Sequence, residues 1–481
     1  MDDISYLQAL NHIRNVKPVF SKRILPLDDA CGWVLADPLF AKFNVPPAPS
    51  STIEGFALCA HDIAKATEKN HITLTKTKFQ AVNRGSHVKP PFDAVISSDK
   101  TVSSTDTELV LKQSVKAGAN IQKTGEEIVK GRLILPGGAK LRPIDIGALA
   151  EYGYMKVTVK CLSVGIIPIG SNFIKPGVTL KPGQTVESNS YMTAAYIKQF
   201  GLPTIRYPVV ENERDKLKKA IMKALKENDI ILIPTGLTTN NTDYLPTVIN
   251  DMGKLIFHGV LMNPAKSSLL GIIKGKPIIG MPSSPLGAVT ALRMFVRPLL
   301  EMWGFSGSAR SKLTATAGSL LETDENIDEL RFGAAAFVEG KPIALPEAKS
   351  ARTQISGIRT NGYIHVPRGI KTVEPGNVVK AVTDADADDL KATILIGGTY
   401  SQGMETFVEN AAEAGLIVKF GEGDPIELLT NKYCHAVCSE KKLNLNIPIE
   451  TFSLCDGTFL IMRKDMNDSL CGSLRRFAGV I

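Results

Sequence analysis

Hydroxyl and amide side chains gather where an apolar segment gives way to a predicted helix. Residues 234–243 read Pro-Thr-Gly-Leu-Thr-Thr-Asn-Asn-Thr-Asp, and they separate a fully apolar strand at 230–233 from a helix expected from about Asp243. Backbone amides at such a helix start, with hydroxyls and side-chain amides around them, suit a phosphate or another oxyanion. The same residue types are also preferred helix caps. Taken alone, this segment therefore favours a capped helix.

Two further segments repeat this arrangement. Residues 281–285 read Met-Pro-Ser-Ser-Pro and place hydroxyls before a helix, and residues 263–268 read Asn-Pro-Ala-Lys-Ser-Ser and add the positive charge of Lys266. Each segment alone is explained by capping. Three of them converging on one sheet edge predict a binding site for an anionic ligand.

Two loop glutamates form a second group of candidate residues. Glu54 and Glu127 each lie beside a glycine-containing turn. Hard cations such as Mg²⁺ prefer oxygen ligands from one or two carboxylates together with a phosphate. An exposed loop glutamate is more often simply solvated, so this pair gains meaning only from a wider pattern.

The elements that must position these loops alternate between strand and helix. Strands are expected at 162–169, 204–210, 230–233 and 278–281, with helices at 191–200, 211–228, from 243 onwards and at 287–303. Alternating units with wholly apolar strands predict a parallel, doubly wound sheet. Ligands of such sheets bind at the carboxyl ends of the strands. The segments after 169, 233 and 281 all fall there.

The remaining chain predicts smaller units. An amphipathic helix begins near Ile4 with Asp2 and Asp3 as candidate caps. Short strands separated by proline and glycine fill 43–129 and again 312–382, and both stretches predict β structure. The run of aspartates at 384–389 is expected to be a solvated linker. A last α/β unit follows, with a strand at 393–396 and a helix from Ser401.

Composition excludes several classes of function. The chain has 481 residues, a formal charge of +8 spread along its length and seven cysteines without framework spacing. These features predict no nucleic-acid binding, no disulfide scaffold and a cytoplasmic location. The acidic start is unlike a signal peptide, and no apolar run approaches the roughly 18 residues that cross a bilayer. No membrane association is expected.

The motifs together resemble the MoeA and gephyrin E-domain family. Residues 46–57 are similar to the family's PPFDNSAMDGYA segment, and 125–128 with 135–147 are similar to its GEDI and LPAGTRLRPADIG elements. Residues 181–189 resemble its PGQ and DSN elements. Residues 234–243, 263–267 and 281–285 stand where SGGVSVGxYD, KPGKP and LPGNP would be. The resemblance covers about Ile4 to Val382 in the family's order and spacing.

This resemblance implies a multidomain α/β and β fold. The implied parts are an elongated N-terminal dimerisation domain, a small β-rich domain, a MogA-like doubly wound α/β domain and a C-terminal β-barrel. A short α/β tail that looks like a truncated periplasmic-binding-protein domain follows. The expected ranges are 1–44 with 138–160, 45–137, 161–306, 310–385 and 391–481.

The family implies insertion of molybdate into molybdopterin, through an adenylylated pterin and Mg²⁺, in a homodimer. The catalytic residues carried over are Glu54, Glu127, Asp243 and Lys266, and the first three would hold the metal. The residues carried over for the pterin are Gly170, Ser188, Asn189, Thr235, Gly236, Thr238, Asn263, Pro282, Ser283, Ser284 and Pro285. Other cofactor-biosynthesis proteins or a client molybdoenzyme would be further partners.

Several positions depart from the family pattern. Pro49 replaces an aspartate, Ser171-Asn172 replaces an acidic pair, Arg84 replaces a threonine and Asn263 replaces a lysine. Glu54 and Glu127 stand where the family has aspartates, so each carboxylate reaches one carbon further. Displacements of about 1 Å can cost much of a positioned group's benefit.

Two interpretations stay open. In the first, the chain is a molybdopterin molybdenumtransferase-like protein that handles molybdate or tungstate with weakened Mg²⁺ binding. In the second, it is a pseudoenzyme that acts as a cofactor-binding, oxyanion-sensing or scaffold protein. The tail supplies one candidate oxyanion position, at Thr399, Ser401 and the helix amides that follow.

Overall fold

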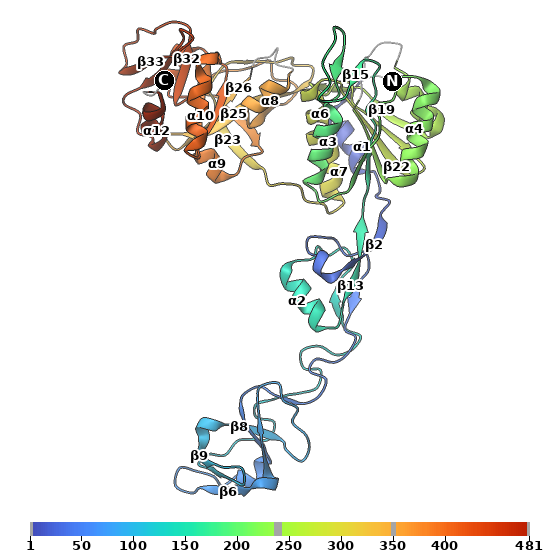
Figure 1. Ribbon diagram of the computed structural model, residues 1–481, viewed down its shortest axis with the longest axis vertical. Helices are drawn as coiled ribbons and strands as arrows, with labels where there is room; N and C mark the ends of the chain where they lie inside the picture. Colours follow the sequence, from blue (N-terminus) through green and yellow to red (C-terminus); the bar gives the residue numbers. More distant parts are fainter. Residues whose placement is uncertain (1–2, 235–242, 348–352, 479–481) are drawn as a thin grey trace. The chain divides into compact units, whose positions relative to one another are not determined.

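The computed structural model describes residues 3–234, 243–347 and 353–478. The chain divides into two compact units (Figure 1). One unit comprises Met1–Ser21 with Leu162–Ile481, and the other comprises Lys22–Cys161. Among the described residues, no helix has both the length and the apolar character that a membrane span requires.

The unit Lys22–Cys161 is built from short strands around separate small cores. Two-stranded pairs join β2 (Ser21–Pro26) to β13 (Lys156–Cys161), β3 (Leu39–Phe40) to β12 (Leu133–Leu135) and β4 (Ser50–Ser51) to β11 (Ile121–Gln122). Two three-stranded sheets follow: β7 (Phe79–Val82), β5 (Gly55–Leu58) and β8 (Ala94–Ser97), and β6 (Ile72–Thr75), β10 (Glu108–Leu111) and β9 (Thr101–Ser104). Leu35 and Leu149 belong to one apolar cluster, whereas Leu58 and Ile96 belong to another. The β character expected from this stretch is confirmed.

A six-stranded sheet forms the centre of the other unit. Its order is β17 (Thr204–Arg206), β14 (Val164–Ile166), β18 (Ile230–Pro234), β22 (Lys276–Met281), β21 (Leu269–Ile273) and β19 (Lys254–His258). The first four strands run parallel, as predicted, while β21 is antiparallel to both of its neighbours. The expectation of a wholly parallel sheet is therefore wrong at this edge. The strands β19 and β21 also went unpredicted.

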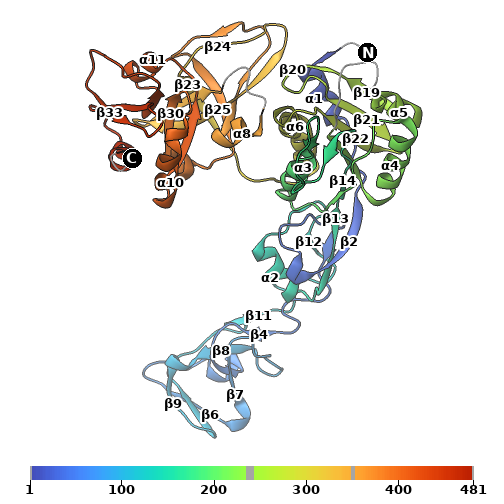
Figure 2. The ribbon, with the colours of Figure 1, turned by 45° about the horizontal axis from the view of Figure 1, so that its top comes forward.

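Helices cover both faces of this sheet (Figures 1 and 2). One face carries α1 (Tyr6–Arg14), α3 (Asn189–Lys198), α6 (Pro285–Ala291) and α7 (Arg297–Met302), and the other carries α4 (Arg214–Glu227) and α5 (Leu245–Met252). Leu217, Ile221 and Leu225 recur at helical spacing along α4 and pack on the sheet, because this spacing keeps them on one side of the helix. The helix starts after β18 and β22 then fall at the carboxyl edge.

The N-terminal helix begins differently from the prediction. Ser5, rather than Asp2 or Asp3, caps α1, and it forms a reciprocal capping box with Gln8. Ile4 lies before the helix in the short strand β1 (Ile4–Ser5), which pairs in parallel with β20 (Val260–Asn263). The start of the chain is thus held against the segment that leads to Lys266.

A closed barrel follows the sheet. The strands β25 (Asp328–Val338), β26 (Lys341–Pro346), β23 (Ser311–Ala317), β29 (Val378–Thr383) and β27 (Gly362–Val366) are hydrogen-bonded in this order, and β27 also pairs with β25. Ala315, Ala335 and Ile364 are among the small and branched residues that fill its inside. The predicted C-terminal barrel is confirmed.

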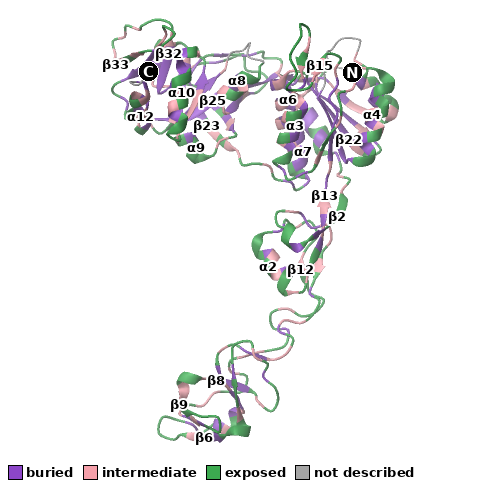
Figure 3. Cartoon of the chain, in the orientation of Figure 1, coloured by how far each residue is buried: buried purple, intermediate pink, exposed green. Residues whose placement is uncertain are grey.

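The tail forms a mixed sheet that packs on the barrel. Its order is β31 (Ile417–Gly421), β30 (Thr393–Gly398), β32 (Ala436–Ser439), β34 (Phe459–Arg463) and β33 (Ile449–Ser453), with α10 (Glu405–Glu413), α11 (Pro425–Thr430) and α12 (Ser469–Ala478). β30 runs parallel to β31 and β32. Ala336 and Leu345 of the barrel share one buried cluster with Ile396 and Phe420 of the tail. Figure 3 shows buried residues along the strands of both parts.

The run of aspartates between barrel and tail is solvent-exposed, as expected, but part of it is an ordered helix rather than a plain linker. Asp386 caps the short helix α9 (Ala387–Lys391) by accepting from the amides of Asp388 and Asp389. Asp384 forms an ion pair with Arg293, whose side chain is only 9% exposed. A buried guanidinium on another element therefore fixes part of this stretch, and the local sequence does not reveal that partner.

Candidate functional site

The carboxyl ends of three parallel strands lie side by side. Pro234 at the end of β18 pairs with Met281 at the end of β22. The amide of Ile169, beyond β14, donates to the carbonyl of Pro234 at 3.1 Å. The segments that follow these three residues therefore start at one edge, as the sequence predicted.

Asn189 ties the start of α3 to the segment after β22. Its Nδ2 donates to the carbonyl of Ser283 at 2.7 Å. Its Oδ1 is buried and has no hydrogen-bond partner. The preceding Ser188 hydroxyl accepts from Nε2 of Gln354 at 2.6 Å. Since an unsatisfied buried acceptor is costly, the free Oδ1 suits a ligand that brings a donor.

The residues after β22 pack tightly on the segment that contains Asn263. Ser284 caps α6 through its hydroxyl, which accepts from the amide of Gly287 at 3.2 Å, and Pro285 follows at the first helical turn. A Cβ on Gly287 would lie 2.6 Å from the carbonyl oxygen of Pro264. Glycine is thus required for this close approach.

The other predicted residues of these segments differ in exposure. Asn263 and Ser283 are exposed, whereas Pro282 is buried. Gly170 lies against the ring of Phe173, which a Cβ would approach to 2.4 Å, and its amide donates to the carbonyl of Val210. Gly170 therefore has a packing role beside its place at the edge.

Asp243 carries a partly buried carboxylate at the start of the helix after β18. One oxygen, Oδ1, accepts from the amide of Leu245 at 3.0 Å, while Oδ2 is buried without a partner. Burial raises the pKa of Asp243 above its usual value, and the Leu245 amide and His258 oppose that rise. The environment of this carboxylate thus favours an incoming donor or cation.

His258 is the residue near this carboxylate that sequence reasoning missed. It ends β19, and it lies opposite Leu269, which in turn pairs with Gly280 near the end of β22. The signal for His258 was absent because β19 and β21 were not predicted as strands. Once their register is known, His258 falls at the same sheet edge as Asp243.

Lys266 does not stand as an uncompensated charge. Its amine lies 3.5 Å from the carboxylate of Asp3, and its side chain is 65% exposed. Asp3 reaches this position because β1 pairs with β20. The sequence offered Asp3 only as a helix cap. An exposed pair of this kind contributes little to stability, so the lysine can exchange Asp3 for an anionic ligand at little cost.

Three predicted residues lie outside the described residues. These are Thr235, Gly236 and Thr238, in the segment that follows β18. Their predicted contacts with the pterin stay predictions.

Glu54 and Glu127 belong to the unit Lys22–Cys161, and both are exposed. The hydroxyl of Tyr152 donates to Oε1 of Glu127 at 2.7 Å, and this hydrogen bond raises the pKa of Tyr152 to about 12. Tyr152 thus orients Glu127. Both glutamates face solvent, which agrees with the common state of loop carboxylates.

The described residues do not fit a Mg²⁺ site. Within residues 3–234, 243–347 and 353–478, no three His, Cys, Asp or Glu side chains are grouped so that they could hold a metal ion. Asp243 lies in a different unit from Glu54 and Glu127. The Oδ2 atom of Asp243 has no hydrogen-bond partner, but one carboxylate does not make a site.

The tail sheet has an edge of the same kind, which its own carboxylates occupy. The amide of Gly403, at the predicted oxyanion position, donates to Asp456 at 2.7 Å, and the Ser401 hydroxyl contacts Thr458. A cavity of about 680 Å³ lies beside Thr399 and includes the following acidic side chains in its wall: Glu322, Glu347, Glu422, Asp424 and Glu427. This edge therefore offers an anion no free donor at Gly403 and several repelling charges.

Comparisons with known proteins cover most of the chain. Residues 4–153 match "MoeA N-terminal region (domain I and II)", and residues 165–302 match "Probable molybdopterin binding domain". The molybdopterin molybdenumtransferase of Staphylococcus epidermidis is 25% identical over 399 residues, covering 79% of this chain and 95% of that protein. The enzyme of the same name from Bacillus subtilis is 26% identical over 380 residues, covering 74% and 88%.

Solved structures agree with the fold. A molybdopterin biosynthesis MoeA protein from Pyrococcus horikoshii aligns with a TM-score of 0.66 and 24% identity, covering 80% of this chain and all of the other. Another structure of a molybdopterin biosynthesis MoeA protein from Pyrococcus horikoshii aligns with a TM-score of 0.58 and 26% identity, covering 79% of this chain and all of the other. Over most of its length, the chain therefore has the fold of known structures. The chain belongs to the MoeA family and has a molybdopterin molybdenumtransferase-like role in molybdenum cofactor biosynthesis.

Proposed function

We propose that the chain binds molybdopterin, or its adenylylated form, at a strand-end site and handles molybdate or tungstate there. The strand-end site comprises the residues at the carboxyl edge of the six-stranded sheet: Gly170, Ser188, Asn189, Asp243, Ser283 and Ser284. The observation that carries the proposal is the pair of buried acceptors without partners, Asn189 Oδ1 and Asp243 Oδ2.

These acceptors match the chemistry of a pterin. The pyrimidine part of a pterin carries ring and amino N–H groups, which are donors. A buried acceptor that gains such a donor recovers the free energy of a hydrogen bond, about 1 kcal/mol for neutral partners and about twice that for a charged one. Two acceptors at one edge would therefore favour a pterin over a ligand that presents only acceptors.

The anionic parts of the ligand need donors and positive charge. Lys266 supplies the charge, because its exposed amine is held only by Asp3. The segment that carries it contacts the first turn of α6, where Pro264 approaches Gly287. We place the pterin phosphate on this side, near Asn263 and Ser283, whose side chains are exposed.

Catalysis of metal insertion is the finer part of the proposal. Glu54, Glu127 and Asp243 do not form a Mg²⁺ site within either unit, so no step is assigned to that metal. The role left to the chain's own residues is to bind the pterin and to hold the oxyanion substrate close to it. A homodimer, as the family implies, would bring the glutamates of one chain towards the strand-end site of the other. Sedimentation equilibrium of the purified chain tests this association.

Loss of Asn189 provides a direct test of ligand binding. The purified protein is oxidised, and the pterin that it carries is measured by fluorescence. The wild type is expected to carry pterin, and Asn189→Leu to carry several-fold less. Asn431→Leu, an exposed position at the end of α11, is the matched control and should carry the wild-type amount. Equal pterin in all three proteins would overturn the proposal.

A second candidate function is binding without insertion. It is favoured by Pro49 and Ser171-Asn172, which stand in place of acidic residues of the family pattern. Molybdenum insertion measured by mass spectrometry on protein supplied with molybdopterin, Mg²⁺ and molybdate separates the two. Bound pterin without insertion would favour a pseudoenzyme, and turnover would exclude it.

A further inference from the structure

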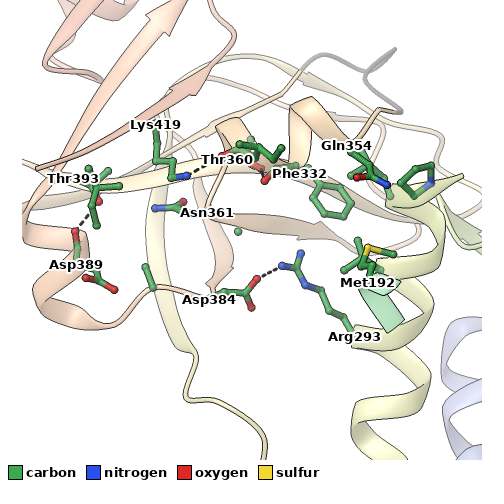
Figure 4. A pocket seen from close by; sticks show the side chains of 18 residues that line it. Met192, Arg293, Phe332, Gln354, Thr360, Asn361, Asp384, Asp389, Thr393 and Lys419 are labelled. Carbon is green, nitrogen blue, oxygen red and sulfur yellow. Dashed lines mark hydrogen bonds and ion pairs between the residues drawn. The ribbon is translucent and has the colours of Figure 1, made fainter. Parts of the chain in front are cut away.

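A second cavity lies where the sheet, the barrel and the tail of one unit meet (Figure 4). We call it the junction cavity, and its volume is about 530 Å³. Helix α6 and the following π-helical turn Leu292–Val296 form one wall, and strand β25 with helix α8 (Gln354–Arg359) forms another. Strands β30 and β31 of the tail close the third side. Its size is that of pockets that hold small organic ligands.

Arg293 points into the junction cavity (Figure 4), and two of its guanidinium nitrogens have no hydrogen-bond partner. Its Nη2 is paired with Asp384, but Nε and Nη1 are buried and have no hydrogen-bond partner. The guanidinium lies 5.4 Å from the ring centre of Phe332 and 5.1 Å from that of Tyr363. These rings and the burial hold the guanidinium in place. A buried guanidinium with unused N–H groups is costly unless an acceptor arrives.

Lys419 adds a second cation from the opposite wall. It lies on β31, and its amine donates to the carbonyl of Ile358 at 2.8 Å. Burial lowers the pKa of Lys419, which shows that its charge is poorly compensated where it lies. The acidic residues in the wall, Asp384 and Asp389, are exposed to solvent instead. The cations are therefore the desolvated groups, and the carboxylates are the hydrated ones.

The rest of the wall is apolar. Met192, Leu286 and Val289 line it from the side of the sheet, and Phe332, Ile358 and Ile417 line it from the barrel and the tail. Apolar surface of this kind favours a ligand with a hydrocarbon or aromatic body, because its burial is favourable. The Phe332 ring beside the guanidinium also suits a flat group.

We propose that the junction cavity binds a small organic anion with a planar apolar body, whose acid group accepts from Arg293 while the body packs on Phe332 and Val289. This inference does not rest on the proposed function. The junction cavity adjoins the strand-end site through Pro285 and through Gln354, which donates to Ser188, but its cations, Arg293 and Lys419, belong to neither list of predicted site residues. The cavity joins three parts of the unit. A ligand held in it would therefore stabilise their packing.

The test uses the full chain and titration calorimetry with phenyl phosphate and with benzoate as probes. Benzyl alcohol serves as the neutral analogue. At least one of the two anions is expected to bind, and benzyl alcohol to bind at least tenfold more weakly than that anion. No binding of either anion, or equal binding of benzyl alcohol, would overturn the proposal.

Three variants locate the binding. Arg293→Gln should weaken the anion at least tenfold, and Val289→Phe should block it by filling the cavity. Arg297→Gln is the matched control, because Arg297 is a poorly exposed arginine one turn further along that pairs with Glu301 and does not line the cavity. Circular dichroism establishes that each variant folds. If Arg293→Gln does not fold, Val289→Phe decides alone, and unchanged affinity in it would reject the cavity as the site.

Discussion

Two sheets of this protein each have an edge where parallel strands end and helices follow, but the polar groups at the two edges are satisfied differently. At the edge of the six-stranded sheet, Asn189 and Asp243 keep acceptors without partners. At the edge of the tail sheet, the equivalent helix start is occupied by Asp456, and the cavity beside it is lined with carboxylates such as Glu347 and Glu422. Parallel strands followed by helices create a place for a ligand in both. Whether a ligand can bind there depends on which polar groups of the loop side chains remain without partners.

The difference between the two edges shows why the oxyanion site predicted for the tail is not available. Thr399 and Ser401 gave the tail the hydroxyls that suggested an oxyanion site, but Ser401 contacts Thr458 and the nearby amide of Gly403 is taken by Asp456. The Gly403 amide is therefore not available to a ligand. The hydroxyl-rich loop is therefore evidence for a site only where its partners are missing.

Tight glycines at the two edges should give the largest effect on stability. Gly287→Ala would place a Cβ 2.6 Å from the carbonyl oxygen of Pro264, and Gly421→Ala would place one 2.2 Å from Cβ of Leu345. Each is expected to lower the free energy of unfolding by about 1–3 kcal/mol, measured by urea titration. Gly472→Ala in α12, with nothing within 4 Å of its Cβ, is the control and should not destabilise.

These substitutions also sharpen the comparison of function. Only Gly287→Ala should reduce the pterin carried by the purified protein, because Gly287 adjoins Ser283 and Ser284. A loss of pterin in Gly421→Ala of the same size would mean that both edges serve one ligand.

Loss of the helix caps should have a smaller effect. Ser284 caps α6, and Asp424 caps α11 by accepting from the amide of Glu427 at 2.9 Å. Ser284→Ala and Asp424→Ala should each cost about 1 kcal/mol, which calorimetric unfolding can resolve. Equal losses of stability with a pterin defect in Ser284→Ala alone would support the contrast between the edges. A pterin defect of equal size in Asp424→Ala would count against it.

The pH dependence of stability should give the smallest effect. Burial raises the pKa of Asp243 and of Glu422 above their usual values, so the folded chain favours the protonated form of each. The corresponding stability is fully present below the unfolded-state pKa, about 4, and is lost as pH rises through the folded-state pKa. Asp243→Asn and Glu422→Gln should therefore raise Tm slightly at pH 7 and leave it unchanged below about pH 4.

If Asp243→Asn instead lowers Tm at neutral pH, the carboxylate is stabilised in its charged form, and its proposed readiness for a ligand is wrong.

Much of the fold could be predicted because buried strands appear in the sequence as short, continuous runs of apolar residues. The wholly buried strand β18 and the amphipathic helix α4 follow directly from their periodicity. The strands β19 and β21 were missed because their segment 254–273 is broken by Gly259, Asn263 and Pro264, which read as loop. Without β19, the position of His258 could not be known.

The candidate site was predictable only in part for a related reason. The segment 281–285 lies at the predicted edge because it follows a parallel strand of the alternating pattern. The segment 263–266 lies beside it, where Pro264 approaches Gly287, although the strands β20 and β21 that flank it were not predicted. The pairing of Lys266 with Asp3 depends on the pairing of β1 with β20. Strand β1 has only two residues, and so short a strand leaves no recognisable pattern in the sequence. Arg293 lies within an apolar helix where an arginine reads as a surface residue. Its burial comes from the barrel, far along the sequence.

Strand β25 has a consequence for any attempt to divide this protein. Its alternate residues face two interiors: Ala335 faces the inside of the barrel, while Ala334 and Ala336 face the tail. Cutting the chain near Asp386 would expose this second face, together with Leu345, to water. A barrel prepared without its tail would then have an exposed apolar surface and would self-associate. We therefore expect the barrel and the tail to unfold together in one cooperative transition rather than independently.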